Sequence, residues 1–480
     1  MRRLQLCLAV LLTSGALAQP PLQRDLDEVG ARMKAVVDSG KAPSIVAAVG
    51  RDGRIVWTAA FGEADKARRA PATTTTPYSL ASVSKPFTAT AVMVLSERGQ
   101  VGLDEPVTRY VGGLARPGEI VPSEVTVRRT LGHVAGFPTH YQFFFEDRSF
   151  EPLSFARTLE CYGGQVDEPG GRYVYSNLGF GVLSELVGRT AGQPYAAFLA
   201  RDVFEPLGLA NARVATRGSP IAGAAVRYGL DGEPLPFYVT DHPGASDVFA
   251  SAEDLVRFGL FHAGSLSPSG PVLTAASRAT MQQPGLGGYG FGWNINPDWN
   301  GRQVIWHSGA MPGVAATLWV VPSDGIAITV LANQFGAPVN QFAGELLAAV
   351  LGVKVPAGGG RAQDEASGSR QTPVPARDLR GRWVGSLSTC PDATSLAVEI
   401  GGPSEVSVTL AGIAMPMLSP SASPGRVSGS FSAPGPMGPS TFRLELRPQG
   451  DRLAGTVIRT TNLDSRGNVA VTLWAELHRP

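Results

Sequence analysis

Strand-like segments lie at both ends of the first 350 residues, and this spacing constrains the fold more than any other feature of the sequence. Residues 44–62 (SIVAAVGRDGRIVWTAAFG) predict two strands around the turn Arg51-Asp52-Gly53. Four further short strands are expected only after residue 285, in YGFGWNI, RQVIWHSG, VAATLWVV and GIAITVLAN. Amphipathic helices at 26–37 and 341–351 flank the two groups. We therefore predict an antiparallel sheet that joins the two ends of one domain.

The long interruption, about residues 75–285, predicts helices and loops. Helical patterns cover 82–99, 176–192 and 251–264, and the last begins with Ser251 as N-cap and Asp254 in a capping-box position. A sheet built from both ends, with a helical region inserted between them, belongs to the α+β class.

A second domain is expected after this one. Residues 355–377 are rich in Gly, Ser and Pro and lack periodicity, which predicts a linker. Residues 378–480 contain short segments in which apolar and polar side chains alternate. They predict a smaller all-β domain, a barrel or a sandwich.

The first 18 residues have the pattern of a secretory signal peptide. Arg2 and Arg3 precede the apolar run 4–12, and Ala16-Leu17-Ala18 supplies the small residues of a cleavage site. The alternative is a membrane anchor, but the apolar run is short for a bilayer span. We therefore expect residues 19–354 to form the first mature domain of an exported protein, periplasmic or secreted. Cleavage leaves Cys161 and Cys390, which either pair or remain two separate thiols.

The charge balance argues against a nucleic-acid partner. The chain has 41 basic and 40 acidic residues, a net charge of +1, and no basic stretch with interleaved aromatic residues. A small molecule or a short peptide is the expected substrate instead.

Lysine is rare in this chain, and the position of Lys85 suggests a catalytic role. Only five of the basic residues are lysines, and Lys85 follows Ser82 by three positions at the start of a predicted helix. Residues three apart share a helix face, so the two side chains can meet. A serine hydroxyl needs a base to become a nucleophile, and lysine, unlike arginine, can lose its proton. A chance S-x-x-K match is the ordinary alternative.

Two more segments bear on the same chemistry. PGGRYVYSNLGFG places Tyr175 and Asn177 at the mouth of a helix, and VIWHSGAMPG carries His307 and Gly309 at a strand edge. Taken singly, these residues have structural explanations: a core tyrosine, a helix N-cap and an ordinary sheet histidine. The chain lacks the G-x-S-x-G, H-E-x-x-H and G-x-x-x-x-G-K-[ST] motifs of competing chemistries.

In this order and spacing, S-x-x-K, Y-x-N and H-x-G resemble the serine β-lactamase and penicillin-binding protein superfamily. The resemblance covers about residues 25–350 and is closest to the class C-like branch, which includes class C β-lactamases, D-aminopeptidases and family VIII esterases. It implies that Ser82 forms the acyl-enzyme and that Lys85, with Tyr175, accepts and returns the proton. It also implies that Asn177 binds substrate and holds Lys85, and that the N–H groups of Ser82 and Ala310 form an oxyanion hole.

One departure from the superfamily pattern concerns the substrate. Penicillin-recognising members carry Lys-Thr-Gly on this strand, whereas this chain has His307-Ser308-Gly309. An unperturbed histidine is only roughly 10% protonated at pH 7.5, so it anchors a carboxylate poorly. If His307 did bind a carboxylate as imidazolium, KM for acidic substrates would rise above about pH 6.5.

The sequence thus predicts an exported serine hydrolase that acts through an acyl-enzyme on a small ester, amide or D-amino-acid peptide bond. The alternatives are a β-lactamase or DD-carboxypeptidase, and a non-catalytic envelope-binding protein. The motifs imply neither a metal ion nor an organic cofactor. Two roles stay open for the β domain: restricting substrate size at the active-site mouth, or contacting the cell envelope.

Overall fold

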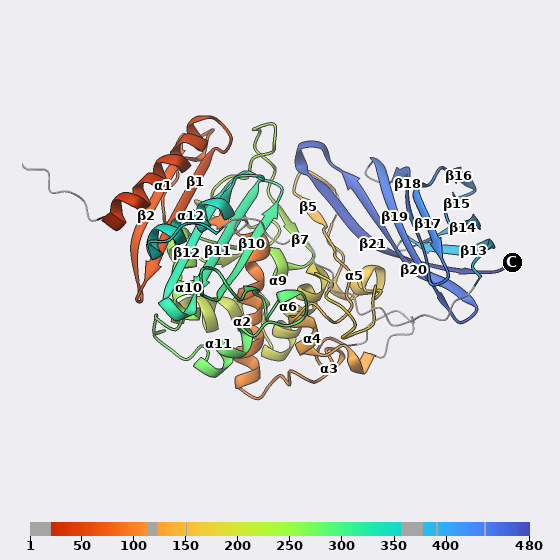
Figure 1. Ribbon diagram of the computed structural model, residues 1–480, viewed down its shortest axis with the longest axis horizontal. Coiled ribbons are helices and arrows are strands. Elements are labelled where there is room, and N and C mark those ends of the chain that lie inside the picture. Colours follow the sequence, from red (N-terminus) through yellow and green to blue (C-terminus); the bar gives the residue numbers. More distant parts are fainter. Residues whose placement is uncertain (1–20, 113–121, 150, 357–377, 390–391, 436–437) are drawn as a thin grey trace, which may run out of the picture.

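The computed structural model describes residues 21–112, 122–149, 151–356, 378–389, 392–435 and 438–480. The predicted leader and residues 357–377 of the predicted linker lie outside the described residues. Figure 1 shows a mixed domain of helices and strands beside an all-β domain formed by the C-terminal residues. The expected α+β class and the all-β C-terminal domain are both confirmed.

Within the described ranges, the first domain is built on one antiparallel sheet of seven strands. Its central pairing joins Ile45 to Ala332, so the first strand lies beside the last one, as the sequence predicted. Across the sheet the strands are β3 (Ala70–Pro71), β2 (Arg54–Asp65), β1 (Ser44–Arg51), β12 (Ile326–Ala332), β11 (Val314–Val321), β10 (Val304–Met311) and β9 (Asn294–Asn296).

Helices cover both faces of this sheet. Along β1, Ile45, Ala47 and Val49 point to one side, where α1 (Pro21–Asp38) and α12 (Val339–Leu351) pack. Val46 and Ala48 point to the other side, toward α10 (Ala252–His262) and the helical region. This alternation follows from the two-residue period of a strand, and β1 is an apolar run because both of its faces are covered.

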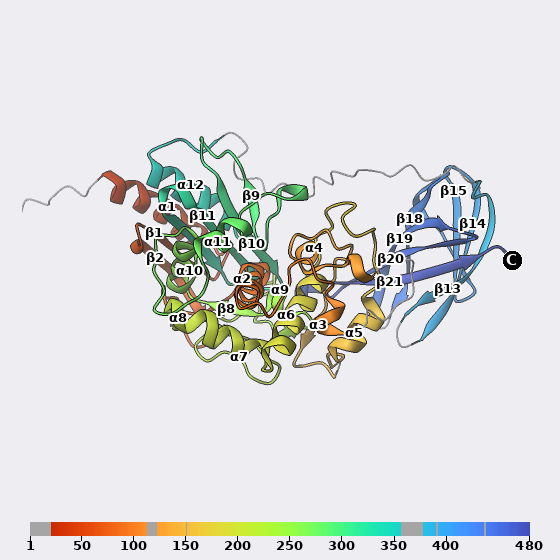
Figure 2. The same ribbon diagram turned by 90° about the horizontal axis from the view of Figure 1, so that it is seen from below.

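The helical region lies between the sheet and the C-terminal domain (Figures 1 and 2). Helix α2 (Ser84–Glu97) packs against α6 (Asn177–Ala191) and α9 (Pro243–Ser246). The other helices are α3 (Thr108–Val111), α4 (Val127–Leu131), α5 (Phe155–Tyr162), α7 (Tyr195–Leu199), α8 (Glu205–Leu207) and α11 (Ala275–Met281). Short strand pairs connect them: β4 (Tyr78–Ser79) and β6 (Arg213–Val214) each pair with β8 (Val248–Ala250), and β5 (Phe143–Phe145) pairs with β7 (Tyr238–Thr240).

The predicted helix ends are largely correct. The capping box of α10 is present, since the Ser251 hydroxyl accepts from the backbone of Asp254 while the Asp254 carboxylate accepts from the backbone of Ser251. One strand prediction was too long: of YGFGWNI, only the last residues enter β9. Gly292 has φ +79°, and a Cβ there would lie 2.8 Å from the Cβ of Ala89 in α2, so this stretch packs as a loop against that helix.

The C-terminal domain is a curved antiparallel half-barrel. In the part that the structure describes, its nine strands are, in order across the sheet, β16 (Ile413–Met415), β15 (Glu405–Leu410), β14 (Ala393–Gly402), β13 (Gly381–Ser388), β21 (Asn468–His478), β20 (Arg452–Asn462), β19 (Gly438–Gln449), β18 (Arg426–Gly435) and β17 (Leu418–Ser423). Phe431 and Phe442 stack in its core with ring centroids 5.1 Å apart.

The hairpin β20–β21 carries the contact between the domains. Figure 1 shows its long strands running from the half-barrel toward β5. Tyr141 and Ala470 exchange two backbone hydrogen bonds of 2.7 and 2.9 Å, and Arg466 forms a two-pronged ion pair with Asp147. The two domains therefore share a short piece of backbone pairing in addition to side-chain contacts.

Two further features concern the sequence predictions. Cys161, in α5, is disulfide-bonded, which answers whether this thiol pairs; Cys390 lies outside the described residues. Among the helices that the structure describes, none combines the length and the apolar character needed to cross a bilayer.

Candidate active site

Ser82 sits at a tight turn that feeds directly into α2. It lies in the 3₁₀ turn Ala81–Val83, after β4 and before Ser84. Ala81 has φ +47°, a left-handed conformation that costs a non-glycine residue energy and is typical of functional sites. The first hydrogen bond of the turn runs from the Val83 N–H to the Leu80 carbonyl, so the N–H of Ser82 precedes the helical ladder.

Lys85 reaches three oxygen atoms from inside the protein. Its Nζ lies 2.7 Å from Oδ1 of Asn177, 3.3 Å from the carbonyl oxygen of Ala245 and 3.1 Å from Oγ of Ser82. The first two atoms can only accept, because the Asn177 amide nitrogen donates to the carbonyl of His140 at 2.8 Å. A neutral amine therefore uses both of its N–H groups on these acceptors, and its lone pair faces the serine hydroxyl.

Burial favours this neutral form. Lys85 is completely buried, and removing it from water lowers the pKa of its ammonium well below the ordinary value. The site therefore supplies what the S-x-x-K spacing predicted: an amine that can take the proton of Ser82.

Tyr175 lies beside Ser82 and Lys85. Its ring centroid is 4.6 Å from Nζ of Lys85, and the Ser82 side chain lies near enough to lower the pKa of its phenol. Burial raises the pKa of the phenol well above its usual value, and the influence of Ser82 offsets this only in part. Tyr175 is therefore a phenol with a proton to pass on, and Lys85 is the better base of the two.

Gly309 brings strand β10 against the turn that holds Ser82. A Cβ at this position would lie 2.0 Å from the carbonyl oxygen of Leu80, so only glycine fits. Pairing with β9 ends at Trp306, which leaves the later part of β10 facing the Ser82 turn. Ala310 follows at the exposed end of this edge, where a strand N–H can complete an oxyanion hole with that of Ser82.

The surroundings of His307 favour its neutral form. Its Nδ1 donates to the carbonyl of Ser308 at 2.7 Å, and its Nε2 accepts from the hydroxyl of Tyr289 at 3.1 Å. Burial and the nearby Lys85 lower its pKa to about 3. His307 therefore lacks the positive charge that it would need to bind a substrate carboxylate, the role considered in the sequence analysis.

Several residues around the site were missed in the sequence. Tyr289 holds His307, Ala245 supplies an acceptor for Lys85, and His140 fixes the Asn177 amide. His133 accepts from the backbone of Ser176 through Nδ1 and lies against the ring of Tyr175. One signal was available: the chain has only six histidines, and two stand in the phrase HVAGFPTH.

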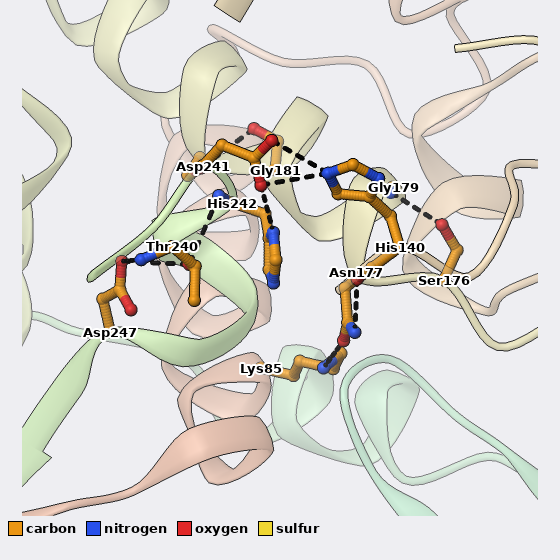
Figure 3. A network of polar contacts seen from close by, with 11 residues as sticks. Lys85, His140, Ser176, Asn177, Gly179, Gly181, Thr240, Asp241, His242 and Asp247 are labelled. Carbon is orange, nitrogen blue, oxygen red and sulfur yellow. Dashed lines mark hydrogen bonds and ion pairs between the residues drawn. The ribbon is translucent and has the colours of Figure 1, made fainter. Parts of the chain in front are cut away.

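One group among the described residues has the donor atoms of a metal site: His140, Asp241 and His242, whose ligand atoms lie within 4.8 Å of one another. Figure 3 shows them beside Asn177 and Lys85. The two rings approach the carboxylate at 2.8 and 2.7 Å, which are ordinary hydrogen-bond lengths.

The C-terminal hairpin reaches the rim of this site. The hydroxyl of Thr472 donates to the carbonyl of Thr139 at 3.1 Å, and the Thr139 hydroxyl donates to the carbonyl of Tyr175. At the hairpin tip, a Cβ on Gly467 would lie 3.0 Å from Pro312, the residue after β10. The hairpin therefore contacts the segments next to both Tyr175 and the oxyanion strand.

The fold and this site define a β-lactamase-family serine hydrolase. Residues 29–352 match the family described as Beta-lactamase, and since this is more than half of the chain, the protein belongs to that family. Two curated relatives are "Penicillin-binding protein 4*" of Bacillus subtilis, 27% identical over 57% of this chain and 64% of that protein, and "Penicillin-binding protein 4" of Amycolatopsis lactamdurans, 30% identical over 59% and 80%. The chain thus matches less than two thirds of the Bacillus protein's length.

Solved structures share the fold at lower identity. The octameric penicillin-binding protein homologue from Pyrococcus abyssi matches 94% of this chain and all of its own, at 21% identity and a TM-score of 0.59. A class C β-lactamase from Rhodobacter sphaeroides matches 68% of this chain and 99% of its own, at 22% identity and a TM-score of 0.57. EstCE1, described as a hydrolase with promiscuous acyltransferase activity, matches 69% and 98%, at 22% identity and a TM-score of 0.55.

Proposed function

We propose that the protein is an exported serine hydrolase that forms an acyl-enzyme on Ser82 and acts on a small ester, amide or D-amino-acid peptide bond. The observation that carries the proposal is the set of contacts around Lys85. Two fixed acceptors use its N–H groups, and the remaining position lies 3.1 Å from Oγ of Ser82. An amine held in this way is a general base for the serine hydroxyl.

The proposed reaction has two steps, acylation and deacylation. In acylation, the proton of Ser82 moves to Nζ of Lys85, Oγ bonds to the substrate carbonyl carbon, and the N–H groups of Ser82 and Ala310 stabilise the oxyanion. The bond to the leaving group then breaks, and the proton returns to that group from Lys85 through the Tyr175 phenol. In deacylation, a water molecule gives a proton to Lys85 and its oxygen bonds to the carbonyl carbon of the Ser82 ester. The bond from that carbon to Oγ then breaks, the acid leaves, and the proton passes from Lys85 to Oγ of Ser82.

The environment of His307 supports a substrate without a carboxylate at this strand. The ring is buried and neutral, with its pKa lowered to about 3, so β10 offers no cation through this side chain. A neutral ester or amide loses nothing by this, whereas a penicillin-like substrate loses the ion pair that Lys-Thr-Gly members provide. The name of EstCE1 is consistent with such substrates, while the names of the penicillin-binding relatives keep the β-lactamase or DD-carboxypeptidase alternative in the test.

The remaining parts of the proposal concern the localisation of the protein and the size of its substrate. The leader pattern at 1–18 and the disulfide at Cys161 support export to an oxidising compartment, periplasmic or extracellular. The hairpin contacts beside Tyr175 and Pro312 support the role of the C-terminal domain in limiting substrate size rather than in contacting the cell envelope.

The test is kcat/KM for p-nitrophenyl butyrate and for a chromogenic cephalosporin, with wild type, Ser82→Ala and Lys85→Arg. We expect ester turnover that both substitutions abolish and little cephalosporin turnover. Fast Ser82-dependent cephalosporin hydrolysis would establish the β-lactamase alternative. If neither substrate, nor D-alanine p-nitroanilide, is turned over in a Ser82-dependent way, the non-catalytic reading replaces the proposal.

A further inference from the structure

A buried carboxylate lies between two histidines directly behind the active site. Nε2 of His140 is 2.8 Å from Oδ2 of Asp241, and Nδ1 of His242 is 2.7 Å from Oδ1 (Figure 3). The three side chains are 0%, 2% and 1% exposed, so water does not share these hydrogen bonds. None of them touches Ser82.

The hydrogen bonds fix the tautomers of both rings. A carboxylate only accepts, so Nε2 of His140 and Nδ1 of His242 must carry the protons. The opposite ring nitrogens, Nδ1 of His140 and Nε2 of His242, are buried and have no hydrogen-bond partner in the described part of the chain. Burial raises the pKa of Asp241, but the two histidines outweigh it and hold the pKa below its ordinary value. Asp241 thus supplies a buried carboxylate charge that is hydrogen-bonded to both rings.

Each histidine leads to one of the two acceptors of Lys85. The carbonyl of His140 accepts from the Asn177 amide at 2.8 Å, and this turns Oδ1 of Asn177 toward Nζ. His242 is the residue before α9, and its carbonyl accepts from the N–H of Ala245, whose own carbonyl accepts from Lys85. Asp241 therefore ties together the two segments that position the base.

The geometry points to His140, Asp241 and His242 as a positioning cluster for the general base, which holds both acceptors of Lys85 in place and sets a fixed negative charge behind them. The inference rests on the proposed hydrolase function and adds residues that do not touch substrate. It also predicts a direction: removing the charge makes the Lys85 ammonium less favourable, so the base becomes neutral at lower pH.

The other groups that face Lys85 do not hide the shift of its pKa that is expected on removal of the Asp241 charge. Tyr175, His133 and His307 surround the amine from three other segments, and burial favours the neutral form of each. Asp247 also interacts with Asp241. Burial raises the pKa of Asp247 to about 7, and its carboxylate accepts a hydrogen bond from the backbone N–H of Thr240. Of the other charged or titratable groups in the described part of the chain, Arg227 acts on Asp247, and Tyr162 of α5 faces Asp241.

A metal ion is the competing explanation for the same three side chains. Each ring already donates to the carboxylate at hydrogen-bond distance, and the group contains only three ligand residues among the described ones. A structural zinc site has four ligands and ligand bonds of about 2.0–2.2 Å for nitrogen and oxygen. The hydrogen-bonded cluster accounts for the geometry without the ion.

The decisive variant is Asp241→Asn, which keeps the shape and removes the charge. We expect kcat/KM for p-nitrophenyl butyrate to fall on the order of tenfold to a hundredfold, because the base is less well held. We also expect the acid limb of the pH profile to move to lower pH. Asp254→Asn is the matched control, because Asp254 is a buried carboxylate in the capping box of α10. This substitution is expected to lower stability and to leave the acid limb of the pH profile in place. An unmoved limb for Asp241→Asn overturns the inference.

A second pair of variants tests positioning apart from charge and covers a failure of Asp241→Asn to fold. His242→Asn places an amide nitrogen near the position of Nδ1 and is expected to keep most of the activity, whereas His242→Leu is expected to lose it with KM little changed. Equal losses in both would overturn the inference, as would stoichiometric zinc in the purified wild type. Absence of Ser82-dependent turnover in wild type would instead fail the proposed function and take this inference with it.

Discussion

Gly309→Ala is the substitution whose effect follows most directly from the structure. The new Cβ would lie 2.0 Å from the carbonyl oxygen of Leu80, whereas real Cβ atoms essentially never approach below 3.0 Å. The strand and the Ser82 turn must therefore separate by at least 1.0 Å, the difference between these distances. Displacements of about 1 Å can cost on the order of 100-fold in rate, and loss of one oxyanion donor costs about 100- to 1,000-fold in kcat.

The assay is kcat and KM for p-nitrophenyl butyrate, together with thermal unfolding. We expect kcat to fall about 100-fold or more, while overpacking lowers the unfolding free energy by about 1–3 kcal/mol. Gly344→Ala is the matched control, because Gly344 is also buried but its Cβ would meet the Trp319 ring at an ordinary 3.7 Å. A Gly309→Ala variant with more than a third of wild-type kcat would refute the argument that this close approach builds the oxyanion hole.

Three further predictions concern charge and the domain contact. Lys85→Met should abolish turnover yet raise stability at pH 7, because burial lowers the folded-state pKa of Lys85. Between that pKa and about 10.4 the unfolded chain binds more protons than the folded one, so the stability of the wild type falls as the pH falls. Chemical unfolding at pH 6–10 should show this slope for the wild type and not for the variant. Because the pKa of His307 is lowered to about 3, KM profiles for an acidic and a neutral ester should run parallel from pH 5 to 8; a rise in KM above about pH 6.5 for the acidic ester alone would restore the imidazolium role. Thr472→Val removes one hydrogen bond to the Thr139 carbonyl, worth about 1 kcal/mol, and should lower kcat/KM by up to about fivefold, while Thr409→Val in β15 should have no effect.

The sequence was sufficient for those parts of the fold and site that depend on local pattern. Strand alternation and the turn at Asp52-Gly53 located the hairpin, and the three-residue spacing brought Ser82 and Lys85 together. The start of the helix was less well predicted, because Ser82 lies in a separate 3₁₀ turn whose strained Ala81 leaves no mark in the amino-acid pattern.

Local pattern alone did not predict the groups that surround Lys85. Asn177 lies 92 positions from Lys85, and its contact with Lys85 was expected only through the family resemblance. Ala245 lies 160 positions away and contacts Lys85 through a backbone carbonyl, which has no residue signature at all. The pKa of His307 is lowered by burial and by the nearby Lys85, so the ordinary pKa of histidine was a poor guide to its charge. Motifs thus identified the reacting atoms, and tertiary packing determined their protonation.

The pairing of β1 with β12 also sets an order of events during synthesis. Strand β1 ends at Arg51, but its partner is complete only at Ala332, 281 residues later. At about 5–20 residues per second, the ribosome needs about 14–56 s to make that stretch. Throughout this interval one edge of β1, an apolar strand buried in the finished protein, has no strand to pair with. A nascent chain of this design therefore depends on being kept from aggregating until β12 emerges.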